Sequence, residues 1–106
     1  MSGTPWVATV DPAKVKEGVP VPVYPKGVGV LLVRLGDDLH AVANKCVHMA
    51  CPLESGLLEG AILACPCHEW RFDVRSGEFL DAPELKIATY PTRVEGDKVL
   101  VQLAEA

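Results

Sequence analysis

The sequence predicts an all-β fold in a single domain that spans residues 1–106. Valine is the commonest residue, glycine and proline recur along the whole chain, and no long 3.6-residue periodicity of apolar side chains is present. Hydrophobic residues make up 49% of the chain and charged residues 23%. This composition is typical of one globular domain and excludes a disordered or fibrous chain.

The first expected elements are a helical turn and an edge strand. Asp11 can cap a helix of about one turn that has Pro12 at its first position and stops at Gly18. Residues 19–23 then alternate valine and proline. Because proline has no N–H to donate to a ladder, we expect an edge strand with its valines facing inward. A polyproline II segment is the alternative conformation for these residues.

Two hairpins are expected further along the chain. Residues 28–35 and 39–43 flank a turn at Gly36-Asp37-Asp38, and residues 89–94 and 98–103 flank a turn at Glu95-Gly96-Asp97. We expect both hairpins to belong to one sheet base. The segment between them, residues 44–83, contains a turn at Ser76-Gly77 and is expected to be an insertion that carries the functional site.

The charge and hydropathy of the chain exclude several classes of function. Ten Lys and Arg residues stand against 14 Asp and Glu residues, and the resulting net charge of -4 argues against a nucleic-acid partner. The longest apolar stretch, Val28 to Val33, is far shorter than the roughly 18–20 residues that span a bilayer. No signal-peptide pattern is visible at the amino terminus, so we expect a soluble, cytoplasmic protein.

Four cysteines and two of the three histidines gather in one part of the insertion. They form the groups Cys46-Val47-His48 and Cys65-Pro66-Cys67-His68, which are separated by sixteen residues, with Cys51 between them. Because the cytosol keeps most thiols reduced, clustered cysteines there indicate metal or redox chemistry. Zinc could accept two Cys and two His ligands, but zinc fingers usually pair Cys with Cys and His with His, whereas each group here is mixed.

The pattern Cys-x-His, sixteen residues, Cys-x-x-His resembles the signature of Rieske-type [2Fe–2S] ferredoxins. The resemblance extends over nearly the whole chain and includes three further stretches: Trp70-Arg71-Phe72-Asp73, Ser76-Gly77-Glu78, and Ala82-Pro83, which matches the proline loop that covers the cluster. It implies the Rieske fold, an antiparallel β-sandwich base domain with an inserted cluster-binding subdomain, here residues 44–83. A structural zinc module is the alternative from a different class.

The resemblance implies a role for each residue of the two groups. Cys46 and Cys65 would bind the inner iron of one [2Fe–2S] cluster, and His48 and His68 would bind the outer iron. The high-potential branch of the family implies a disulfide between Cys51 and Cys67, which would join the two cluster loops.

The chain nevertheless departs from the high-potential branch. Trp70 and Phe72 stand where that branch has Ser and Tyr donors to the cluster sulfurs, and Glu69 replaces the glycine that usually follows the second histidine. The sequence is therefore a hybrid of the ferredoxin and high-potential branches.

Other polar and apolar residues have simpler interpretations. His40 is expected to be a solvated residue of an alternating strand. Leu57 and Leu58 are expected to pack the site loop, and Leu53 either packs there or lies at an exposed tip beside the histidines. If Glu54, Glu59 and Glu69 surround the cluster, they favour a basic docking face on a partner.

The expected function is one-electron transfer without catalysis of its own. The resemblance implies a monomeric carrier between a reductase and a terminal oxygenase or other oxidoreductase. The alternative is a Rieske small subunit of a larger enzyme, such as a nitrite reductase or an arsenite oxidase. No general base beside a nucleophile and no phosphate-binding glycine loop is visible in the sequence.

Overall fold

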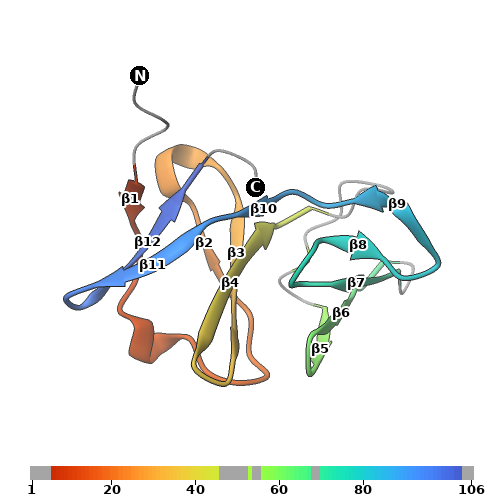
Figure 1. Cartoon of the computed structure of the whole chain (residues 1–106), viewed down its shortest axis with the longest axis horizontal. Coiled ribbons are helices and arrows are strands. Elements are labelled where there is room, and N and C mark those ends of the chain that lie inside the picture. Colours follow the sequence, from red (N-terminus) through yellow and green to blue (C-terminus); the bar gives the residue numbers. More distant parts are fainter. Residues whose placement is uncertain (1–5, 46–52, 54–55, 68–69, 104–106) are drawn as a thin grey trace.

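Short antiparallel strands build the protein (Figure 1). The computed structural model describes residues 6–45, 53, 56–67 and 70–103. A three-stranded sheet has the order β1-β12-β11 and a four-stranded sheet the order β10-β4-β3-β2. A five-stranded sheet has the order β5-β6-β7-β8-β9. The strands are β1 (Trp6–Ala8), β2 (Val21–Val23), β3 (Val30–Leu35), β4 (Asp38–Ala43), β5 (Leu57–Glu59), β6 (Ile62–Ala64), β7 (Arg71–Asp73), β8 (Glu78–Phe79), β9 (Ala82–Lys86), β10 (Thr89–Tyr90), β11 (Thr92–Glu95) and β12 (Lys98–Gln102).

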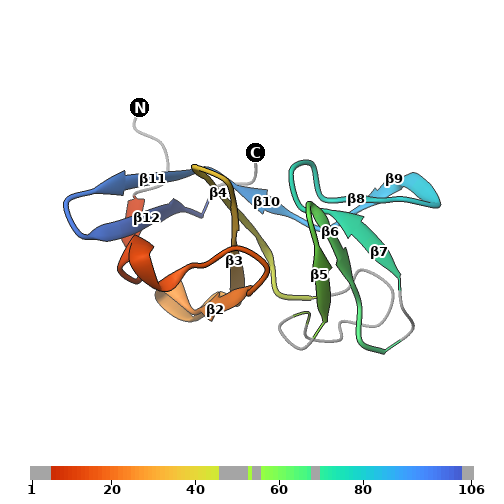
Figure 2. The ribbon, with the colours of Figure 1, turned by 90° about the horizontal axis from the view of Figure 1, so that it is seen from below.

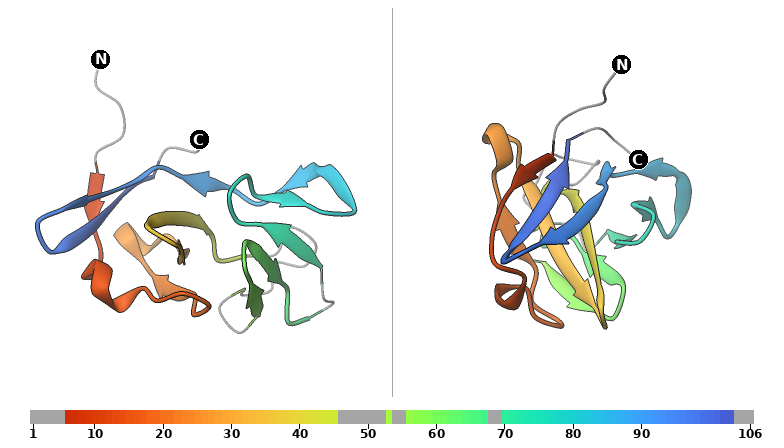
Figure 3. Two further views of the ribbon diagram at one scale, coloured as in Figure 1. Left: turned by 60° about the horizontal axis from the view of Figure 1, so that its bottom comes forward. Right: turned by 60° about the vertical axis from the view of Figure 1, so that its left-hand side comes forward.

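The three sheets follow one another along the longest axis of the molecule. Figure 2 shows the three-stranded sheet at one end, the five-stranded sheet at the other, and β3 and β4 between them. The left view of Figure 3 shows the same order. In the sequence, the five-stranded sheet lies between β4 and β10, which are neighbours in the four-stranded sheet. The chain therefore leaves the four-stranded sheet after β4 and returns to it at β10.

Both faces of the central hairpin β3–β4 are buried. Successive residues of β3 point to opposite faces, because the side-chain period of a strand is two. One face joins the base core, and the other joins the ligand-side core. The base core contains Val15, Val23, Val30, Leu32, Ala41, Val99 and Val101. The ligand-side core contains Leu31, Val33, Val42, Leu53, Leu58, Leu63, Cys65, Phe72, Val74, Phe79 and Ile87. This two-sided burial explains why β3 begins with four consecutive apolar residues.

The helical turn predicted after Asp11 is present as a 3₁₀ helix, Pro12–Lys14, but it ends before the predicted stop at Gly18. The Asp11 side chain accepts a hydrogen bond from the Ala13 N–H at 2.8 Å, as expected of an N-cap. The Arg34 side chain donates hydrogen bonds to the carbonyls of Pro12 and Val15, so β3 holds the turn against the base. A second 3₁₀ turn, Pro25–Gly27, follows β2. In the described part of the chain, no helical segment is long and apolar enough to cross a membrane.

The valine–proline segment forms an edge strand, as predicted, but only in part. β2 lies at the edge of the four-stranded sheet, where Pro22 pairs with Leu31. Val23 is buried in the base core, whereas Val19 precedes the strand and is 56% exposed. The prediction that all of these valines face inward is therefore wrong for Val19, because the paired strand begins only at Val21.

Both predicted hairpins form, but they lie in different sheets. β3 and β4 belong to the four-stranded sheet, whereas β11 and β12 pair in the three-stranded sheet. The predicted strand 89–94 divides at Pro91 into β10, which pairs with β4, and β11. Proline cannot donate to a ladder, so a strand that contains it changes partner there at little cost. The expectation of a single sheet for both hairpins was wrong for this reason.

Candidate metal centre

In the sequence, the first predicted ligand group falls between β4 and β5, within residues 44–53, which are here called the first ligand loop. Asn44 is 8% exposed, and its side-chain Oδ1 accepts a hydrogen bond from the Leu53 N–H at 2.8 Å. The Asn44 N–H donates to the Gly29 carbonyl at 3.1 Å. These bonds close the base of the loop and attach it to β3 and its preceding residue. The predicted residues Cys46, His48 and Cys51 lie outside the described residues.

The second predicted group lies in the loop between β6 and β7, here called the second ligand loop (residues 65–70). The Cys65 N–H donates to the Trp70 carbonyl at 2.7 Å, which closes the base of this loop as well. Cys65 is 1% exposed within the ligand-side core and forms no disulfide. Pro66 and Cys67 are exposed. His68 and Glu69 lie outside the described residues, so the place of His68 stays a prediction.

The two ligand loops are held close to each other at their bases. A Cβ on Gly56, which follows the first ligand loop, would lie 2.1 Å from the carbonyl oxygen of Ala64, the residue before Cys65. Only glycine allows this backbone approach without displacement. Leu53 and Cys65 share the ligand-side core. The structure thus brings the end of the first loop beside the start of the second.

An aromatic group packs beneath the second ligand loop. The rings of Trp70 and Phe79 stack with centroids 4.1 Å apart and planes 1° apart. Phe72 is fully buried and meets Phe79 at 5.7 Å with a tilt of 42°. These contacts connect the loop to β7 and β8. A phenylalanine side chain carries no hydrogen-bond donor, so Phe72 can donate nothing to a bound group.

An ion pair stabilises the turn after β7. The Arg75 guanidinium donates to the Asp73 carboxylate at 3.0 and 2.7 Å, and the Arg75 N–H donates to it at 2.9 Å. The side-chain hydrogen bonds from Arg75 hold the pKa of Asp73 below its ordinary value, with a smaller contribution from the charge of His40. His40 lies in β4, as predicted, but its side chain is partly buried and not fully solvated.

The apolar residues named in the sequence analysis take distinct positions. Leu53 is fully buried, so it packs the first ligand loop and does not lie at an exposed tip. Leu58 is also buried, whereas Leu57, beside it in β5, is 64% exposed. Ala82 and Pro83, matched to a proline loop, begin the edge strand β9. The predicted turn at Ser76-Gly77 is confirmed, with Gly77 at a φ of +81°.

The sequence analysis did not identify two residues that shape the site, Asn44 and Gly56. Asn44 lies between an apolar strand and the first ligand group, and a buried polar residue at such a junction is a signal for loop closure. Gly56 belongs to the dipeptide Ser55-Gly56, a turn signal of the same kind as Ser76-Gly77. Its contact is with Ala64, which no local pattern reveals.

The chemistry of the Cys65 thiol fits one ligand of an iron–sulfur cluster. A buried thiol that forms no disulfide, at the start of a closed surface loop, can bind a metal as a thiolate shielded from solvent. Within the described residues, no three His, Cys, Asp or Glu side chains gather closely enough to hold a metal ion. This agrees with a site for which three of four predicted ligands lie outside those residues.

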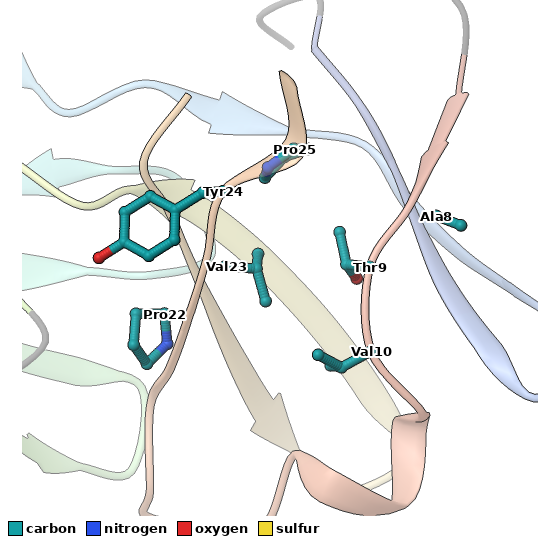
Figure 4. Close-up of a pocket in the computed structure, with 7 residues that line it drawn as sticks. All are labelled: Ala8, Thr9, Val10, Pro22, Val23, Tyr24 and Pro25. Carbon is teal, nitrogen blue, oxygen red and sulfur yellow. The ribbon is translucent and has the colours of Figure 1, made fainter. Parts of the chain in front are cut away.

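The cavity drawn in Figure 4 lies in the base, away from the ligand loops. It has a volume of about 270 Å³, between β2 and the residues that follow β1. Val23 on one side and Thr9 and Val10 on the other point into it. The Thr9 hydroxyl donates to the Val99 carbonyl at 2.7 Å, so it is engaged in the fold. The residues that line this cavity carry no nucleophile paired with a base.

Comparisons with known proteins agree with this geometry. The chain is 35% identical over 100 residues to the ferredoxin component of a naphthalene 1,2-dioxygenase system from Pseudomonas aeruginosa, covering 93% of this chain and 96% of that protein. The solved ferredoxin of carbazole 1,9a-dioxygenase from Nocardioides aromaticivorans IC177 is 34% identical, with a TM-score of 0.79 over 95% of this chain and 98% of that one.

A third comparison bears on the fold alone. A solved complex of reduced oxygenase and oxidised ferredoxin in carbazole 1,9a-dioxygenase contains a chain with a TM-score of 0.86 at 23% identity, covering 95% of both chains.

The family model for the Rieske [2Fe-2S] domain matches residues 5–91. This match and the two relatives show that the chain belongs to the Rieske [2Fe–2S] family, with a [2Fe–2S] cluster as its cofactor in place of the zinc ion considered above.

Proposed function

We propose that the protein is a one-electron carrier that takes electrons from a reductase and delivers them to the terminal oxygenase of a multicomponent dioxygenase system. The observation that carries this proposal is the end-to-end similarity to a dioxygenase ferredoxin component, 35% over 93% of the chain. A ferredoxin component serves an oxygenase as a separate chain, so the similarity favours a free carrier over a small subunit of a larger enzyme. The substrate that is oxygenated binds to the terminal oxygenase and not to this protein.

We further propose that Cys46 and Cys65 bind one iron of the cluster and that His48 and His68 bind the other. The buried Cys65 thiol and the hydrogen bonds that close both loops support this ligand set. The cluster supplies a site that accepts and releases one electron. Two neutral imidazoles in place of two thiolates make the centre less negative, so the protein accepts an electron more easily than an all-cysteine ferredoxin does.

Three other features belong to the same proposal. Residues 44–83 act as the cluster-binding subdomain, which the closed loop at Asn44 supports. Cys51 and Cys67 form a disulfide between the ligand loops. The protein works as a monomer in the cytoplasm, where reduced nicotinamide cofactors supply reductases.

Iron and sulfide analysis tests the ligand set directly. We expect about two irons and two acid-labile sulfides per chain. Replacing Cys46, His48, Cys65 or His68 by Ala should abolish cluster assembly. The matched control is His40→Ala, which removes the one histidine outside the two groups and should retain the cluster. A fully loaded His48→Ala protein, or a colourless wild-type protein that holds one zinc, contradicts the proposal.

Spectroscopy and reconstitution test the carrier role. The dithionite-reduced protein should give an EPR signal with an average g-value below that of all-cysteine clusters, because of the mixed His and Cys ligation. Added to a dioxygenase reductase and oxygenase pair that lacks its own ferredoxin, the protein should restore electron flow. A Cys65→Ala protein should not. If the loaded protein is not reduced by any such reductase, the carrier role is wrong while the ligand set stands.

Thiol counting tests the disulfide. Denatured protein from which the cluster has been removed without oxygen should show two free thiols, and four after reduction. Four thiols in both samples contradict the bridge.

A further inference from the structure

The second ligand loop is held at both ends by contacts of different kinds. At its start, the Cys65 side chain is buried in the ligand-side core. At its end, Trp70 accepts the 2.7 Å hydrogen bond from the Cys65 N–H through its carbonyl. This bond between backbone groups joins the two ends of the loop. Both proposed ligands of this loop, Cys65 and His68, lie within the segment that this bond spans.

The Trp70 ring is fixed against a buried partner. It lies parallel to the Phe79 ring, 1° apart at 4.1 Å, and Phe79 is 8% exposed. Phe79 in turn contacts the fully buried Phe72 of β7. Phe79 also pairs with Phe72 in the sheet. The indole thus rests on a ring that the core itself immobilises, and a parallel stack restricts the tilt of a flat side chain more than general apolar packing does.

We propose that Trp70 is a positioning residue of the cluster site: its stack on Phe79 sets the geometry of the second ligand loop and thereby the electronic environment of the cluster. The inference rests on the proposed function, since it concerns the ligands assigned there. It goes beyond that function by separating two tasks within the loop. Cys65 and His68 bind the iron, and the stack of Trp70 on Phe79 fixes the end of the loop that carries them.

The stack on Phe79 requires a flat side chain at position 70. A flat ring at position 70 can maintain the parallel contact, whereas a branched aliphatic side chain of similar hydrophobicity cannot. The other tryptophan, Trp6, gives a matched comparison. It is partly buried in β1, at the opposite end of the molecule, under the guanidinium of Arg93 at 4.8 Å. A change at Trp6 reports the general cost of losing an indole.

The test compares holoproteins with Trp70→Leu, Trp70→Phe, Phe79→Leu and Trp6→Leu. The readouts are the EPR g-values and linewidths after dithionite reduction, the midpoint potential by voltammetry, and the rate of cluster loss in chelator. We expect Trp70→Leu and Phe79→Leu to broaden the EPR signal, shift the potential and accelerate cluster loss by about tenfold or more, because metal sites weaken by such factors when the residues that support their ligands are changed. Trp70→Phe should restore wild-type values, and Trp6→Leu should retain them.

A double variant separates a joint role from two independent ones. If the rings act as a unit, Trp70→Leu combined with Phe79→Leu should lose the cluster no faster than either single variant. The proposal is overturned if Trp70→Leu keeps the wild-type EPR signal and potential. It is also overturned if Trp70→Phe behaves like Trp70→Leu, including the case in which neither assembles a cluster. A wild-type protein without a Rieske EPR signal would instead refute the proposed function.

Discussion

At Gly56, the backbone just after the first ligand loop lies close to the backbone just before the second. The Gly56 N–H donates to the Leu53 carbonyl at 2.9 Å, and an added Cβ would lie 2.1 Å from the Ala64 oxygen and 3.1 Å from the Leu53 oxygen. Both neighbours are backbone atoms, so neither can rotate away. We predict that Gly56→Ala displaces the end of β6, with a loss of about 1–3 kcal/mol of stability. Iron content and the thermal unfolding midpoint should both fall.

Gly29→Ala provides the control for this prediction. The nearest atoms to a Cβ at Gly29 are Asn44 Cβ at 3.7 Å and Tyr24 Cε1 at 3.8 Å, which are ordinary contacts. This variant should keep its iron content and change stability by less than about 0.5 kcal/mol. Equal losses in the two variants would show that the Gly56 contact has no special role.

Phe72 affects the redox potential because its side chain has no hydroxyl group. A hydroxyl donor to the cluster sulfurs stabilises the more negative, reduced form, and Phe72 provides none. The wild-type midpoint should therefore lie in the lower half of the Rieske range of about -150 to +300 mV. We predict that Phe72→Tyr raises it by roughly 40 mV, about 1 kcal/mol, where a structure of the variant shows the hydroxyl donating to the Cys46 thiolate. Voltammetry that finds no rise in such a variant contradicts the argument.

At the scale of elements, the turn between β7 and β8 depends on the Asp73–Arg75 pair. Because Arg75 lowers the pKa of Asp73 in the folded protein, the pair stabilises the fold fully above the unfolded-state pKa of about 3.9. This stabilisation is lost as the pH falls through the lowered folded-state pKa. In Arg75→Gln, the wild-type advantage in unfolding midpoint should be constant from about pH 7 to pH 5 and shrink below about pH 4.

Thermal unfolding followed by circular dichroism between pH 3 and pH 7 measures this difference. The control is Arg93→Gln, which breaks the Arg93–Glu95 pair, both of whose side chains are about half exposed. That change removes an ion pair exposed on both sides and the contact of Arg93 with the Trp6 ring, so it should lower the unfolding midpoint by a small amount. A wild-type advantage over Arg75→Gln that grows on acidification has the opposite sign to the one argued here.

The sequence predicted individual strands better than their partners. The turns around Gly36 and Gly96 and the alternation of Val99 and Val101 are local signals, and both hairpins formed where they indicated. The division at Pro91 between two sheets depends on contacts with β4 and β12, which are distant in sequence. Proline signalled an interruption of the strand, but the direction that the chain takes after it is set by tertiary packing.

For the candidate site too, the sequence predicted individual residues better than the contacts between them. The residue types and spacing around Cys65 predicted a ligand because metal chemistry needs particular donors, and Cys65 is buried as a cluster thiolate should be. The contacts that shape the loops join residues without a recognisable motif. Examples are the Asn44–Leu53 hydrogen bond and the stack of Trp70 on Phe79. Such contacts follow from the folded arrangement and cannot be deduced from spacing.

At the scale of the whole molecule, the central hairpin couples the base to the ligand end. Leu31 and Val33 of β3 face the ligand-side core, while Val30 and Leu32 face the base core. A change in either core is therefore transmitted to the same strand. The two cores differ in composition. The base core consists of strand residues together with Val15, which follows the first 3₁₀ helix, whereas the ligand-side core includes Leu53 and Cys65 from the ligand loops.

This difference predicts how the protein responds to loss of its cluster. Metal binding contributes folding free energy in small domains, and the ligands proposed here lie in the loops that complete the ligand-side core. In cluster-free protein, hydrogen exchange should accelerate more at the amides of Leu63 and Phe72 than at those of Val99 and Val101, by more than about tenfold. Exchange measured by NMR on holoprotein and cluster-free protein gives the comparison, with Arg75→Gln holoprotein as the control for local loosening of β7. Equal acceleration in both cores would mean that the central hairpin unfolds with the cluster site as one cooperative unit.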